Sequence, residues 1–168
     1  MARTIYGAEV FRTSDGSGTV NIEYDAIGKN SEVFAQGDIV GLASGLLLVT
    51  TTTMVGVVVK TQTVASDNQT VAKVKPGYIP LFNDTLFLMG ANSDLSVTAG
   101  PGTYYPITGA TGAQQIDVDG GVATGATRNV EIVQVDPFND GGTGSGSGLR
   151  IAVVRILKTP YQNVTLTA

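Results

Sequence analysis

The residues best suited to chemistry are two aspartates, Asp117 and Asp119, which stand two positions apart before the glycine pair 120–121. On a β-strand, side chains at i and i+2 share one face, so these two carboxylates would be neighbours. Two neighbouring carboxylates could divide the acid and base roles of glycoside hydrolysis. Acidic residues directly before a glycine turn are also ordinary turn formers, and we favour that interpretation.

The rest of the composition offers little to a catalyst or a metal ion. The chain has no histidine and no cysteine, so the commonest general base, the thiolate nucleophile and most transition-metal sites are missing. A calcium loop of the EF-hand type needs a third oxygen ligand that residues 117–121 lack, and Asp136, Asn139 and Asp140 have the wrong spacing. We therefore predict that the chain is not an enzyme and has no cofactor and no bound metal.

Charge and hydropathy exclude several classes of ligand. The formal net charge is −4 and the basic residues are scattered, whereas nucleic-acid binding needs a basic stripe. The glycine-rich stretch 141–148 lacks the lysine of a phosphate-binding loop. The 21 uncharged residues 39–59 could span a bilayer, but their glycines and four consecutive threonines favour two buried strands joined by a glycine turn. We expect no nucleic acid, no membrane and no small-molecule substrate.

The N-terminus, Met1–Tyr6, has no apolar stretch of the kind found in a signal peptide. Three sequences, beginning at Asn68, Asn83 and Asn163, fit the glycosylation acceptor pattern. Without a secretion signal, chance explains all three better than modification.

The composition favours strands and tight turns. Only 24 of 168 residues are charged, about half of the usual quarter. Valine and threonine are abundant and there are 22 glycines, which suit pleated sheets and hairpin turns. No stretch has apolar residues at helical spacing behind a capping residue. We therefore predict an all-β chain of one domain, or one domain with an arm.

Alternation of apolar and polar residues places the expected strands. Pro80 confines residues 78–82 to a sheet edge or a bend, because proline cannot donate to a ladder. Ser66–Asn68 is predicted to be a turn that leads into a strand at 70–75. The other expected strands are 20–24, 33–35, 39–42, 46–50, 54–61, 85–89, 103–107, 129–135 and 149–157. Such short, closely spaced strands are typical of a sandwich or a small barrel.

The chain is predicted to divide near residue 31. Residues 1–31 would form an N-terminal arm and a first strand, because the stretch 15–18, Asp-Gly-Ser-Gly, interrupts the apolar pattern. Residues 32–168 would form the β-rich body. The Gly/Ser-rich stretch within 136–148 would be a mobile hairpin loop.

One part of the body resembles a known family. Residues 63–75, Thr-Val-Ala-Ser-Asp-Asn-Gln-Thr-Val-Ala-Lys-Val-Lys, followed by 78–80, Tyr-Ile-Pro, resemble a segment of small head proteins of tailed bacteriophages. Residues 37–40 and 55–58 fit the same pattern, so the likeness covers roughly residues 33–90. The resemblance implies a capsid decoration (cement) protein, which binds the outside of the shell and braces neighbouring major capsid protein subunits, often as a homotrimer.

That resemblance also implies an architecture and a location. The body would be a compact β-barrel, β-tulip-like, or a jelly-roll sandwich, with an extended N-terminal arm. The protein would be made in the cytoplasm of the bacterial host and reside on the capsid surface of the virion. If the chain is such a decoration protein, the candidate contacts with the capsid or with a second subunit are Ile5, Tyr6, Val10 and Phe11. The alternative is that these four residues complete the protein's own core.

A second functional class stays open from the residues alone. The chain could be a head-fibre or tail-associated β module that binds glycans of the host surface. Such a module needs exposed aromatic side chains in loops, and Tyr104, Tyr105 and Phe138 are the candidates.

Overall fold

The structure is a computed structural model that describes residues 5, 7–12, 20–81, 85–95, 100–135 and 151–157. Nearly all regular structure in those ranges is β, so the predicted fold class is confirmed. Two short helical turns complete it, a π-helical turn η1 (Asn68–Ala72) and a 3-10 turn η2 (Gly125–Thr127). Within the described ranges no helix is long and apolar enough to cross a membrane.

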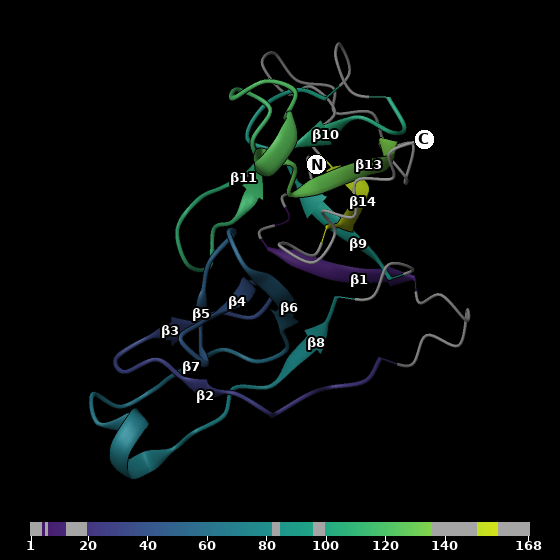
Figure 1. Cartoon of the computed structure of the whole chain (residues 1–168). Coiled ribbons are helices and arrows are strands. Elements are labelled where there is room, and N and C mark those ends of the chain that lie inside the picture. Colours follow the sequence, from purple (N-terminus) through teal and green to yellow (C-terminus); the bar gives the residue numbers. More distant parts are fainter. Residues whose placement is uncertain are drawn as a thin grey trace, which may run out of the picture.

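Five strands form the upper sheet of Figure 1, and every neighbouring pair in it is antiparallel. In spatial order they are β1 (Ala8–Arg12), β9 (Leu86–Gly90), β14 (Ile151–Ile156), β13 (Val130–Val135) and β10 (Tyr104–Tyr105). A short hairpin, β11 (Ile107–Thr108) with β12 (Gln115–Ile116), lies beside this sheet. The upper sheet therefore joins the N-terminal strand to the two late strands predicted near 129–135 and 149–157.

A second five-stranded sheet lies below it and comes from one continuous part of the chain (Figure 1). In spatial order its strands are β2 (Ile27–Gly28), β5 (Leu46–Val49), β4 (Ile39–Ala43), β6 (Met54–Val58) and β8 (Tyr78–Pro80). The β2–β5 pair is parallel and the others are antiparallel. A further pair, β3 (Val33–Phe34) with β7 (Gln62–Thr63), completes this half. Pro80 lies in the edge strand β8, as predicted.

The uncharged stretch 39–59 forms three strands, with β4 between β5 and β6. Strands β4 and β5 are joined by a two-residue turn in which Ser44 and Gly45 both have positive φ, 51° and 78°. Positive φ at both positions is what a type I′ hairpin turn requires. Strand β6 then returns on the other side of β4. The predicted glycine turn is confirmed between β4 and β5, whereas the stretch contains three strands and not two.

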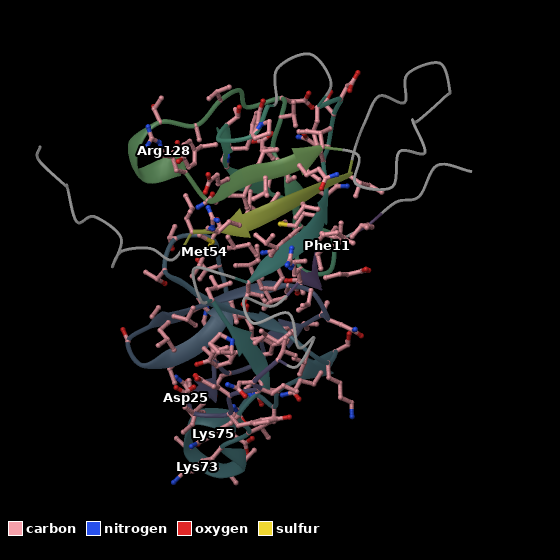
Figure 2. The ribbon with its side chains drawn as sticks, turned by 90° about the vertical axis from the view of Figure 1, so that its right-hand side faces the viewer. Phe11, Asp25, Met54, Lys73, Lys75 and Arg128 are labelled. Atoms are coloured by element: carbon pink, nitrogen blue, oxygen red, sulfur yellow. The ribbon has the colours of Figure 1, made fainter. Side chains whose placement is uncertain are left out.

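One apolar core joins the two sheets. Met54 and Ile39 of the lower sheet belong to the same buried cluster as Phe87 and Met89 of the upper sheet, and Figure 2 places Met54 at mid-height between them. Burial of apolar surface between layers is the main stabilising contribution in a fold of this kind. A second cluster fills the lower half alone: Ala26, Phe34, Val40, Leu47, Val58, Val64 and Tyr78.

Polar contacts also connect the two halves, and one such joint is centred on Asp38. The buried carboxylate of Asp38, just before β4, accepts hydrogen bonds from the backbone N–H groups of Ala35 at 2.9 Å and of Gly112 at 2.7 Å. Gln114 Oε1 accepts a hydrogen bond from the backbone N–H of Ile39 at 2.6 Å. Residues 112 and 114 both lie between β11 and β12, so these bonds connect the hairpin beside the upper sheet to the lower sheet.

Two expected strands differ from the structure. Residues 70–75 were expected to be extended, and this prediction is wrong, because residues 68–72 form η1 and Lys73 has a left-handed φ of 49°. Residues 20–24 make a single bridge, between Glu23 and Tyr78, instead of a full strand. In the first case a side-chain hydrogen-bond network, described below, outweighs the strand preference of valine and threonine.

The described part of segment 1–31 contributes to both sheets. Strand β1 is an edge strand of the upper sheet, and β2 is an edge strand of the lower sheet. The predicted division near residue 31 stays a prediction. The Gly/Ser-rich loop, at 136–148, lies outside the described residues.

Candidate interaction surfaces

The four predicted contact residues have different surroundings. Ile5 is buried and packs with Leu88, Ile151 and Val153 on one face of the upper sheet. Val10 is half-buried against the core that joins the two sheets. Phe11 is 41% exposed, and Tyr6 lies outside the described residues. Among the three that are described, only Phe11 offers a large apolar surface to a partner.

The exposure of Phe11 has a local cause. The pairing of β1 with β9 runs Val10 to Phe87 and then Arg12 to Leu86, so Phe11 is the extra residue of a β-bulge. A bulge locally redirects the side chain of the extra residue and interrupts the ladder. Because β1 is also an edge strand, this aromatic side chain stands at the rim of the sheet, where Figure 2 labels it.

Tyr24 is a second exposed aromatic residue, which sequence reasoning missed. Its side chain is 57% exposed, and Ile22 beside it is exposed as well. The Tyr24 ring lies against Gly77, where an added Cβ would come within 2.7 Å of the ring. The sequence signal was Gly77, which has no side chain and so leaves room for a ring. No sequence pattern links Gly77 to residue 24.

The hydroxyl of Tyr78 connects this segment to the lower sheet. It donates a hydrogen bond to Asp25 Oδ1 at 2.6 Å and a longer one to Glu23 Oε2 at 3.4 Å. Burial raises the pKa of the Tyr78 hydroxyl, and the hydrogen bond to Asp25 and both carboxylates raise it further. Tyr78 is therefore a neutral donor that holds the segment in place.

The apolar side chain with the highest exposed fraction among the described residues, that of Val71, lies on a projecting turn, residues 68–75, here called the Asn68 turn. Figure 1 shows its η1 ribbon at the lower end of the molecule. Residues 69–75 are all exposed, and Val71 is 71% exposed. Lys73 and Lys75 extend from the same end in Figure 2. The turn thus presents valine and lysine side chains on one short stretch.

Asn68 fixes the conformation of this turn. Its side chain is fully buried, and Nδ2 donates to Gly28 O at 2.7 Å and to Val74 O at 3.1 Å. Oδ1 accepts a hydrogen bond from Val74 N at 2.7 Å. The backbone closes the turn, because Lys73 N donates to Asn68 O at 2.7 Å. With both amide hydrogens engaged and no exposed surface, Asn68 cannot act as a glycosylation acceptor in the folded chain; Asn83 and Asn163 lie outside the described residues.

The aromatic residues proposed for glycan binding are less available. Tyr105 is fully buried in the core. Tyr104 is half-buried, and the Arg128 guanidinium lies over its ring, 4.8 Å from the centroid. Phe138 lies outside the described residues. A ring covered by a guanidinium is already stacked on that face and does not present it to a sugar.

Of the aspartate pair, Asp117 stabilises the turn that follows it and Asp119 is exposed. Asp117 Oδ1 accepts hydrogen bonds from Gly120 N at 3.0 Å and from Asn92 Nδ2 at 2.8 Å, and Asn92 Oδ1 in turn accepts from Val118 N. Asp119 is exposed beyond the strand. Asp117 thus organises the turn that follows it. Across the described residues, no three acidic side chains are grouped so that they could hold a metal ion.

Comparison of the chain with protein-family models, with curated proteins and with solved structures found no match. The resemblance to phage head proteins therefore rests on residues 33–90 alone.

Proposed function

We propose that this chain is a structural virion protein of a tailed bacteriophage. It binds the outside of the assembled capsid as a homotrimer and cements neighbouring major capsid protein subunits. Binding that favours the assembled shell over free subunits stabilises the shell by mass action. The proposal needs a rigid body with exposed apolar side chains and no reaction centre.

Phe11 is the observation that carries this proposal. It is an aromatic side chain directed outward by a bulge on an edge strand, and aromatic residues contribute most to protein interfaces when a partner buries them. The neighbouring residues Ile5 and Val10 are turned toward the protein's own core. These positions support the alternative that Ile5 and Val10 complete the protein's own core. The exposure of Phe11 supports a contact of this residue with the capsid.

Sedimentation with shells tests the function. The purified chain is mixed with mature shells stripped of it and, separately, with isolated capsid subunits. We expect co-sedimentation with shells only, and a particle in free solution of three times the 17.3 kDa chain mass by light scattering. A monomer that ignores shells would contradict the proposal.

The contact role of Phe11 needs a matched pair of variants. Phe11→Ser removes the exposed ring, and Val33→Ser removes an exposed apolar side chain, 45% accessible, from strand β3. We expect Phe11→Ser to weaken shell binding by at least about tenfold and Val33→Ser to leave it unchanged. Equal binding by both variants would exclude Phe11 from the contact.

Glycan recognition is a second candidate, and Tyr24 is the observation that favours it. Its ring is 57% exposed, and an exposed aromatic face can stack on a sugar. Binding of the chain to an array of bacterial surface glycans, lost on Tyr24→Ala, would support this class. Absence of binding on the array would contradict glycan recognition as the function of this chain.

A further inference from the structure

We propose that the Asn68 turn is a second docking element, which inserts Val71 into an apolar recess bordered by carboxylates on the partner protein. The inference rests on the proposed function in taking the capsid shell as that partner. It assigns to residues 68–75 a contact separate from that of Phe11, which lies on β1 of the upper sheet.

Val71 is exposed to a degree that folding does not explain. It is the most exposed large apolar residue among the described positions, at 71%. Val74, three residues on, is exposed as well. Single exposed apolar residues are ordinary on protein surfaces, so Val71 alone identifies nothing. Its position at the tip of a turn held by a buried polar anchor distinguishes it.

The rigidity of the turn is the second observation. Asn68 satisfies Gly28 O and both backbone groups of Val74, and Gln69 N donates to Asn30 Oδ1 at 2.7 Å. These bonds hold seven consecutive exposed residues in one conformation without an apolar side chain of the turn entering the core. A partner that binds a preorganised turn loses less conformational entropy than one that orders a flexible loop.

Charge identifies the partner's chemistry. From Asp67 to Tyr78 the chain has two lysines and one carboxylate, the exposed Asp67, so this stretch has a formal net charge of +1 (2 − 1) although the whole chain has −4. Neither Lys73 nor Lys75 has an ion-pair partner among the described residues. In Figure 2 both extend at the end of the molecule, whereas Asp25 lies nearer the body, where its carboxylate accepts the Tyr78 hydroxyl. A complementary surface would therefore supply carboxylates opposite Lys73 and Lys75, at the border of the recess for Val71.

Binding of the full chain to stripped shells, measured over a range of salt concentrations, tests the docking element. Val71→Ser should weaken binding by about tenfold, the loss expected when one buried valine contact is removed. The double variant Lys73→Glu with Lys75→Glu should weaken it further and should abolish its weakening by added salt. All three positions are exposed, so the free energy of unfolding should stay within about 0.5 kcal/mol of wild type.

Matched controls separate this site from general surface effects. Lys60→Glu makes, at an exposed lysine outside the turn, the charge change of one of the two lysine substitutions. Val122→Ser alters a valine, 55% exposed, three residues before η2, whose ribbon lies at the other end of the molecule in Figure 1. Both controls should bind shells like wild type.

The outcomes of these experiments distinguish a failure of the docking element from a failure of the proposed capsid function. If wild type binds shells and the turn variants bind equally well, the docking element is wrong and the proposed function stands. If wild type itself does not bind shells, both are wrong. If the double lysine variant turns an oligomer into a monomer in sedimentation velocity, a second copy of the chain occupies the turn, which overturns shell docking.

Discussion

The side chain of Asn68 and the backbone of Val74 form a reciprocal pair of hydrogen bonds. Val74 N donates to Asn68 Oδ1 at 2.7 Å, and Asn68 Nδ2 donates to Val74 O at 3.1 Å. The same Nδ2 reaches Gly28 O at 2.7 Å, so one amide connects the Asn68 turn to strand β2. Asn68 is fully buried, and its bond to Gly28 O lies in the interior, whereas its two bonds to Val74 are partly buried.

Asn68→Ala should therefore destabilise the chain. Gly28 O loses a partner in a buried site, where an unsatisfied group costs about 1–3 kcal/mol, and Val74 N loses one in a partly buried site. The urea midpoint should fall clearly, whereas Gln69→Ala, which removes an exposed side chain and leaves the Gln69 N–H bond to Asn30 intact, should match wild type. An Asn68→Ala variant as stable as Gln69→Ala would mean that the turn is held by its backbone alone.

The lower sheet was largely predictable, because its strands are marked by local signals. The uncharged stretch 39–59 is too rich in glycine and threonine for a helix, and Gly45 supplies the positive φ that a two-residue hairpin turn needs. Pro80 could be assigned to an edge from its missing N–H alone. For the upper sheet, β1 (Ala8–Arg12) was not predicted as a strand, and the others were predicted only separately. The sheet brings residues 8–12 beside 86–90, and 86–90 beside 151–156, and nothing local encodes such long-range pairing.

The candidate surfaces were predicted less well. The sequence gives the apolar character of Ile5, Val10 and Phe11, but only the bulge in β1 decides that Phe11 is exposed. The alternation Val71, Lys73 suggested a strand face, whereas Asn68 uses its amide to close a π-helical turn. A side chain that bonds backbone six residues away has no periodic signature, so alternation alone could not reveal it.

Gly56 and Gly77 should respond differently to alanine. A Cβ at Gly56 would come within 2.1 Å of the buried Tyr78 ring and 2.7 Å of Ile79 O, both fixed in the lower sheet. A Cβ at Gly77 would meet the Tyr24 ring at 2.7 Å, and that ring is exposed and free to rotate away. We expect Gly56→Ala to cost about 3 kcal/mol or more, in the range of overpacked cores, and Gly77→Ala to cost under about 1 kcal/mol. Thermal unfolding compares the two, and similar losses would contradict the assignment of the Tyr24 ring as movable.

Alanine substitutions at Asp117 and Asp119 should differ in their effect on stability if the role of Asp117 is structural. Asp117→Ala removes the acceptor for Gly120 N and Asn92 Nδ2, at a cost of about 1–2 kcal/mol in a partly exposed site. Asp119→Ala changes an exposed side chain and should be neutral within about 0.5 kcal/mol. Urea unfolding measures both. Equal stability of the two variants would reopen the possibility that the carboxylates serve chemistry instead of the turn.

Asp38 should make stability depend on pH in a direction opposite to that of most carboxylates. Burial raises the pKa of its carboxyl above the ordinary value of 3.8; hydrogen bonds from the Gly112 and Ala35 N–H groups oppose the shift, and the charge of Glu32 adds to it. The folded chain therefore binds this proton more readily than the unfolded chain, so the contribution of Asp38 to stability rises as pH falls through the raised pKa and levels off below 3.8.

Comparison of wild type with Asp38→Asn isolates that contribution, because the other titrating groups cancel in the difference. The asparagine keeps one acceptor oxygen and turns an NH2 group toward Ala35 N or Gly112 N, so the variant should lose about 1–3 kcal/mol at neutral pH. Its deficit relative to wild type should widen as the pH is lowered from neutral to about 4, since only the wild type gains the proton. Urea unfolding of both proteins across this range measures the deficit. A deficit that stays constant or narrows on acidification would show that Asp38 is not the buried proton acceptor at the joint between the two sheets.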